Sequence, residues 1–321
     1  MGQRFRTPLT CLIALAAFIA ACGEGADDSA LDDEMREDDT TAQATADGRP
    51  GWPPPAVWQR IVFASGVSRR NIYIVDADGE NQTRIRNSPE SDYHPAVSPD
   101  GKRIAFISRR DDATEVFAMD ADGRNVKNHT NHPWNDSWPS WSPDGSRIAF
   151  VSERDGNREI YVMDVDRGKQ TNLTNHRLND TYPSWSPDGR RIAFSSSREG
   201  DMDIYVMDAD GGNQVRLTNT PGYDQAPDWS PDGIQIAFQP SPDGDGPVDI
   251  HVMDADGSNR ANLTNHPTND RAPAWSPDGA RIAYESWTGI TSDIYLIDAN
   301  GDNRTRVTST PGADMRPSWS P

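Results

Sequence analysis

The stretch Pro139-Ser140-Trp141-Ser142-Pro143-Asp144-Gly145, with the apolar run Arg147–Ser152 after it, recurs along this chain of 321 residues. Successive Ser-Pro-Asp-Gly copies start 44 residues apart, except for one interval of 46. The chain ends on Ser320-Pro321, where a sixth copy would begin. Repeats of about 40–50 residues with strand-like content are typical of propellers and solenoids. The five complete copies start at Ser98, Ser142, Ser186, Ser230 and Ser276.

Each copy contains four short segments that have the character of strands. In one copy these are Pro139–Ser142, Arg147–Ser152, Ile160–Asp164 and a stretch that ends at Thr174. They are rich in β-branched and aromatic residues and are bounded by Gly, Pro, Asp or Asn, which indicates strands joined by turns. The sequence therefore predicts an all-β fold.

The phase of the repeat predicts how the fold closes. The first copy starts at Arg60 without a preceding Ser-Pro-Asp-Gly, and the last contains only Arg316–Pro321. The two fragments complement each other, so the C-terminal one would supply the innermost strand of the blade that the N-terminal one begins. Such closure removes free sheet edges. We expect residues 58–321 to form a six-bladed β-propeller of four-stranded blades, closed by pairing of the terminal segments.

Residues 1–21 have the pattern of an export signal. Arg4 and Arg6 precede an apolar run that is too short to span a bilayer comfortably. The end of this run, Ile19-Ala20-Ala21-Cys22, resembles the lipobox of bacterial lipoproteins, which implies a lipid on Cys22 and removal of the preceding segment. Ordinary signal cleavage near Ala21 is the alternative. Gly23 after the Cys favours the outer membrane in that family's sorting rule.

Residues 22–57 predict a lipidated, disordered tether. Ten acidic residues and two arginines lie between positions 23 and 50, with few apolar side chains, so this segment cannot build a core. Its end is proline-rich, at Trp52-Pro53-Pro54-Pro55. The net charge of the whole chain is −19, which would repel nucleic acid, so we expect no nucleic-acid partner.

The repeat resembles that of the TolB family of propellers. The resemblance rests on Trp-Ser-Pro-Asp-Gly-x-x-Ile-Ala-Phe and on Ile-Tyr-Val-Met-Asp-x-Asp-Gly, and it extends over residues 60–321. TolB itself carries an α/β domain ahead of its propeller, whereas this chain has the lipobox and the tether there. The resemblance thus implies a TolB-like propeller lipoprotein, exported and anchored in the bacterial envelope, on the periplasmic side of the outer membrane or at the cell surface.

Comparison of the six copies separates structural positions from variable ones. One position holds Trp in five copies and Val97 in the sixth, and we expect it to build the core between blades. The Asp-Ala-Asp-Gly-x-Asn runs, such as Asp76–Asn81, fit turns better than calcium loops, because the further carboxylates of such loops are absent. A weakly bound cation such as calcium in the channel stays an alternative; we expect no other cofactor.

An aspartate precedes the strand Pro by three residues in every copy, and we expect these aspartates to ring one mouth of the channel. They cap the strand entrance in one interpretation and attract a cation or an amine in the other. The set is Asp92, Asp136, Asp180, Asp224, Asp270 and Asp314.

The position two residues after each of these aspartates varies. It combines residue types that are enriched at binding hot spots, so we expect a binding surface at the same mouth, together with the variable loops there. Drift without any ligand is the alternative. The residues are His94, Trp138, Tyr182, Ala226, Ala272 and Arg316.

These patterns favour a non-enzymatic binding module, monomeric, with an envelope protein or a peptidoglycan or other saccharide as its partner. Its membrane contact would be through the lipid anchor alone. The sequence shows no Gly-x-Ser-x-Gly and no paired catalytic histidines. The alternative is a propeller enzyme, a hydrolase or lyase acting on peptide or saccharide, with His94, Tyr182 and Arg316 at the channel mouth.

Overall fold

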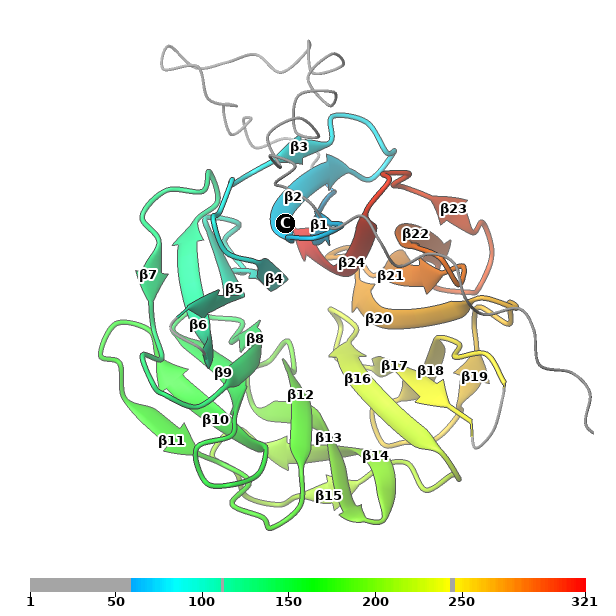
Figure 1. Ribbon diagram of the computed structural model, residues 1–321. Coiled ribbons are helices and arrows are strands. Elements are labelled where there is room, and N and C mark those ends of the chain that lie inside the picture. The colour runs from blue at the N-terminus through cyan, green and yellow to red at the C-terminus, as the bar shows by residue number, and fades with distance from the viewer. Residues whose placement is uncertain (1–58, 111–112, 243–245) are drawn as a thin grey trace, which may run out of the picture. The chain divides into compact units, whose positions relative to one another are not determined.

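The computed structural model describes residues 59–321, apart from 111–112 and 243–245. This part of the chain is all-β, with 24 strands in six sheets of four antiparallel strands. Figure 1 shows the six sheets arranged around a central axis as the blades of a propeller. The predicted fold is confirmed. The predicted signal peptide, the predicted lipidation site at Cys22 and the predicted tether lie outside the described residues. No helix in the described part of the chain is long and apolar enough to cross a membrane.

The strands of each blade follow one another from the channel outwards. Blade 1 consists of β24 (Ala313–Ser320), β1 (Arg60–Gly66), β2 (Asn71–Asp76) and β3 (Thr83–Arg84). Blade 2 consists of β4 (Asp92–Val97), β5 (Arg103–Arg110), β6 (Ala113–Asp120) and β7 (Lys127–Asn128). Blade 3 consists of β8 (Asp136–Trp141), β9 (Arg147–Ser152), β10 (Glu159–Asp164) and β11 (Gln170–Asn172).

The other three blades repeat this order. Blade 4 consists of β12 (Asp180–Trp185), β13 (Arg191–Glu199), β14 (Asp201–Asp208) and β15 (Val215–Arg216). Blade 5 consists of β16 (Tyr223–Trp229), β17 (Gln235–Ser241), β18 (His251–Asp254) and β19 (Ala261–Asn262). Blade 6 consists of β20 (Asn269–Trp275), β21 (Arg281–Trp287), β22 (Ser292–Asp298) and β23 (Thr305–Arg306).

Blade 1 closes the ring as predicted. Strand β24 pairs with β1, with Trp319 opposite Ile61 and Ser320 opposite Arg60. In Figure 1 the red β24 lies beside the blue β1 and β2, so the two ends of the described chain share one sheet. The last strand therefore occupies the innermost place that the N-terminal segment leaves empty.

The core lies between blades. Six apolar clusters each combine residues from two neighbouring blades, which is why each blade is stable only beside the next. Trp141, only 7% exposed, packs with Ile107 and Val116 of the preceding blade and donates its indole N–H to the Ala96 carbonyl at 3.0 Å. The Arg103 guanidinium lies 4.6 Å from the Trp141 ring centroid and covers it. The repeated tryptophans are thus structural.

The repeated polar runs form turns. Ser98 Oγ donates to Asp100 Oδ1 at 2.7 Å and accepts the Arg103 N–H at 2.9 Å. In the other run, Asn81 adopts a φ of 55° and its Nδ2 donates to Asp76 Oδ2 at 2.7 Å. The carboxylates of both runs are engaged within their own turns. Among the described residues, no three His, Cys, Asp or Glu side chains are grouped so that they could hold a metal ion.

Candidate binding cavity

Every innermost strand carries an irregularity at the position that varies between copies. Its pairing with the neighbouring strand shifts register there, and the variable residue adopts a positive φ of 50–56°. Left-handed backbone costs a non-glycine residue about 1–2 kcal/mol, so six such residues in one ring are held by the surrounding structure. Backbone strain of this kind clusters at functional sites.

These bulged positions line a cavity of about 480 Å³ inside the channel. Its walls come from all six innermost strands, starting at the variable residue of each strand, and four blades add a residue that follows the strand, namely Pro99, Pro231, Pro277 and Pro321. The loops that enter the innermost strands do not contribute to its lining. The variable residues therefore lie in the channel wall, deeper than the channel mouth at which the sequence placed them.

Four of the variable side chains are stacked one on the next. The ring centroids of His94 and Trp138 are 5.8 Å apart with nearly parallel planes, and those of Trp138 and Tyr182 are 4.5 Å apart with planes inclined by 43°. The Arg316 guanidinium lies 5.1 Å from the Tyr182 ring centroid and donates from Nη2 to the Tyr182 hydroxyl at 3.3 Å. The stack joins blades 1 to 4, whereas blades 5 and 6 have only alanine, Ala226 and Ala272, at the variable position. The cavity is therefore asymmetric.

Electrostatics give the members of this stack different roles. Burial, with the nearby Arg316 and Arg70 charges, holds the pKa of His94 well below its usual range, so the imidazole is neutral at pH 7. No carboxylate of the described residues lies within ion-pair distance of the Arg316 guanidinium, but against the effect of burial the nearby Tyr182 and Glu285 raise the pKa of Arg316. The acidic side chain in contact with this residue is Glu285, whose Oε2 accepts the Arg316 backbone N–H at 3.2 Å. One cation and one neutral imidazole thus lie on the stacked side.

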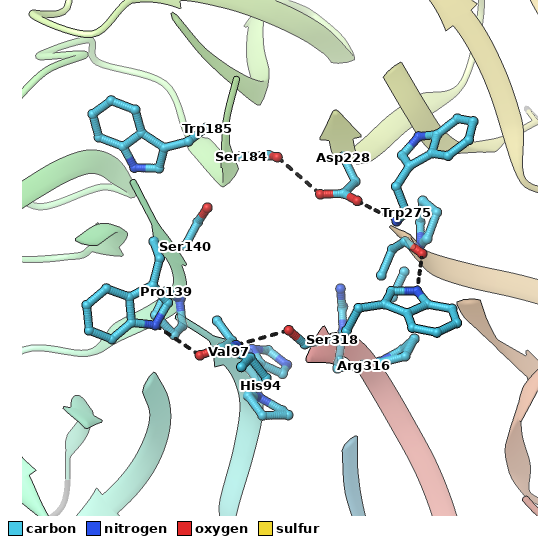
Figure 2. Close-up of a pocket in the computed structure, with 18 of the residues that line it drawn as sticks. His94, Val97, Pro139, Ser140, Ser184, Trp185, Asp228, Trp275, Arg316 and Ser318 are labelled. Carbon is cyan, nitrogen blue, oxygen red and sulfur yellow. Dashed lines mark hydrogen bonds between the residues drawn. The ribbon is translucent and has the colours of Figure 1, made fainter. Parts of the chain in front are cut away.

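Asp228 is a cavity residue that the sequence analysis missed. It lies two residues after Ala226, and Figure 2 shows it between Ser184 and Trp275. Ser184 Oγ donates to Oδ1 at 3.2 Å and the Trp275 backbone N–H donates to Oδ2 at 2.8 Å. Burial raises its pKa to about 7. A signal existed in the sequence, because the other copies have only Ala or Ser at this position, namely Ala96, Ser140, Ser184, Ala274 and Ser318.

The six repeated aspartates do not line the cavity. Each is at most 2% exposed and none converges with the others on open space. Asp180 accepts from Arg198 Nη2 at 3.0 and 3.1 Å, Asp224 from Arg260 Nη2 at 3.2 Å, and Asp270 from Ser286 Oγ at 2.6 Å. They are internal hydrogen-bond acceptors within the fold, at the start of each innermost strand. This corrects the expected ring of carboxylates at the channel mouth.

The remaining members of that set follow the same pattern. Thr310 Oγ1 donates to Asp314 at 2.8 Å, Arg154 Nη2 to Asp136 at 3.4 Å, and Arg86 Nε lies 3.5 Å from Asp92. Burial raises the pKa of Asp92, Asp136, Asp224, Asp270 and Asp314. Arginine and hydroxyl partners oppose that rise. The arrangement fits a structural cap better than an amine-attracting funnel.

Comparison with known proteins identifies the family. The family model described as the TolB beta propeller domain matches residues 54–223 and 214–321. The chain belongs to the TolB β-propeller family. TolB from Acinetobacter baumannii is 27% identical, with a TM-score of 0.73 over 82% of this chain and 67% of that one. A putative TolB from Agrobacterium tumefaciens, 24% identical, has a TM-score of 0.67 over 82% of this chain and 91% of that one.

A more distant structure shares the TolB-like fold alone. Hydrazine synthase from Kuenenia stuttgartiensis is 16% identical, with a TM-score of 0.69 over 83% of this chain and 47% of that one. A TolB-like propeller with a formed channel cavity is suited to binding. The match to the family model and the two TolB structures confirm the resemblance to the TolB family that the repeat indicated.

Proposed function

We propose that this TolB-like propeller is a non-enzymatic recognition module that binds an envelope partner, a protein or a saccharide, in its channel cavity. One observation carries the proposal. In a fold whose blades otherwise repeat, the cavity wall has a different side chain in almost every blade. Aromatic and arginine side chains that surround a concave site are typical of binding hot spots.

The lipobox-like sequence that ends at Cys22 supports a location in the bacterial envelope for this binding activity. A lipid on Cys22 and the acidic segment to residue 57 would hold the propeller at a membrane and leave it free to reach a partner in the bacterial envelope.

The enzymatic alternative has weaker support from the geometry. A lyase or hydrolase at this site would use His94 as its base, but that imidazole is stacked on Trp138 and its pKa is held low by burial and by Arg316. Tyr182 has its hydroxyl on the Arg316 guanidinium. These contacts hold the His94 and Tyr182 rings and the Arg316 charge in place, which favours ligand recognition over proton transfer.

An affinity capture tests the proposal. The full chain, its Trp138→Ala variant and its Trp134→Ala variant would each serve as bait in envelope extract. Trp134 is the matched control, because it is 55% exposed and lies outside the cavity. We expect one partner to be enriched by the unmodified chain and by Trp134→Ala, and to be reduced about tenfold or more by Trp138→Ala. Equal enrichment by all three baits would contradict binding in the cavity.

A further inference from the structure

The cavity has an open side, and Asp228 lies on it. The stacked His94, Trp138, Tyr182 and Arg316 side chains come from blades 1 to 4. Blades 5 and 6 place only alanine at the corresponding positions, which leaves space there. Asp228 belongs to blade 5 and receives its hydrogen bonds from blades 4 and 6 (Figure 2). It is thus the carboxylate beside the unfilled part of the cavity.

The Asp228 carboxylate has capacity for a further donor. Two oxygens offer about four lone-pair positions, and the structure uses two, for the Ser184 hydroxyl and the Trp275 N–H. No charged side chain in the described part of the chain acts on it. The other ionisable residues of the cavity wall are His94, Tyr182 and Arg316, and none contacts it. A half-buried carboxylate with no cation in contact is less stable than one that is paired, so a cation brought by a ligand would stabilise Asp228.

A metal ion is a poor candidate for that cation. Among the described residues, Asp228 is the single carboxylate in the cavity wall, and hard cations such as Ca²⁺ take six or more oxygen ligands. A primary ammonium group needs fewer partners, because it has three donors on one small head.

We propose that the cavity takes its ligand through a primary ammonium group, which binds Asp228 while the body of the ligand fills the space beside Ala226 and Ala272. This inference rests on the proposed function and names the chemistry that the site recognises. The ammonium group can belong to a lysine side chain of a peptide or to an amino sugar.

Matched pairs of probes test the inference and separate the two sources. The full chain would be titrated by calorimetry at pH 7, where both amines are mostly charged, with N-acetyl-lysine methylamide and its neutral analogue N-acetyl-norleucine methylamide, and with glucosamine and glucose. We expect at least one ammonium probe to bind about tenfold to hundredfold more tightly than its neutral analogue. Preference for the lysine probe assigns a peptide source, and preference for glucosamine assigns a saccharide. Equal binding within both pairs, or no binding, overturns the inference.

A variant and a proton balance locate the contact. Asp228→Asn keeps the shape and the acceptor for Trp275 but removes the charge, so the ammonium preference should vanish. It should persist in Asp201→Asn, which removes an exposed charge outside the cavity wall. Because the free carboxylate has a pKa of about 7, ammonium binding at pH 7 should release about half a proton per ligand. Titrations in two buffers of different ionisation enthalpy measure that release without any variant.

The outcomes separate this inference from the proposed function. A partner captured through the cavity, together with no ammonium preference and no proton release, would overturn the ammonium inference alone. Loss of cavity-dependent capture together with an intact ammonium preference would overturn only the proposed partner. Persistence of the preference in a folded Asp228→Asn variant would place the ammonium elsewhere and contradict the assignment to Asp228.

Discussion

Asp228 links the stability of the propeller to pH. Its pKa is about 7 in the folded chain, against an ordinary value of 3.8. Below about pH 4 the carboxyl is protonated in both the folded and the unfolded state. As the pH rises from 4 to 7, the unfolded state loses this proton first, so the free energy of unfolding falls, and above pH 7 the full penalty of the enclosed charge applies.

Asp228→Asn removes this penalty. We expect the variant to have a free energy of unfolding about 2–4 kcal/mol above that of the unmodified chain at pH 8, and one similar to it at pH 4. Urea denaturation at the two pH values measures the difference. Asp201→Asn, at an exposed site, should change little at either pH. An Asp228→Asn chain that is less stable than the unmodified chain at pH 8 would show that the charge stabilises the fold instead.

The residues of the site were partly predictable from sequence. His94, Trp138, Tyr182 and Arg316 stand out because one repeat position varies in chemistry, and the structure brings all four into one stack. Asp228 was missed because the other five copies carry only Ala or Ser at its position, so the position does not stand out as a place for a functional side chain. The aspartates were misplaced for a physical reason. An aspartate that recurs in every blade can accept the same kind of internal hydrogen bond in each. Its recurrence in the sequence does not show whether its carboxylate is buried or faces the channel.

At the scale of the strand, the bulge determines what the cavity wall presents. All six variable residues have φ between 50° and 56°, and none is glycine. The irregularity interrupts the strand pairing, as between Arg271 and Ala274. The alternation of a regular strand therefore does not predict which side chains face the channel. This is why sequence spacing placed the variable residues at the mouth rather than in the wall.

The bulge predicts a clear order of tolerance at Ala272, whose φ is 52°. Asn is among the residues that adopt left-handed backbone with least strain, whereas a β-branched residue adopts it rarely. We expect Ala272→Val to lower the free energy of unfolding by about 1–2 kcal/mol relative to Ala272→Asn. Chemical denaturation of the two variants measures this. Equal stability would mean that the strand relaxes to regular pairing when the residue changes.

For the whole molecule, repetition made the fold predictable. Each blade meets the next through the same type of apolar cluster, which contains the repeated Trp in five of the six interfaces and Val97 in the other. The phase of the repeat specified how β24 completes blade 1. Function depends on departures from that symmetry. The differences among the six innermost strands turn a repetitive channel into a cavity with a stacked aromatic side and an open acidic side.

Filling the cavity tests most directly whether recognition takes place inside the channel. Ala272→Trp places on the open side a residue that blade 3 already carries at the corresponding bulge, where Trp138 has a φ of 50°. The variant should fold with little change in Tm and should lose, by about tenfold or more, the partner that the unmodified full chain captures from envelope extract. Undiminished capture by the folded Ala272→Trp chain would contradict the claim that the propeller recognises its partner inside the channel.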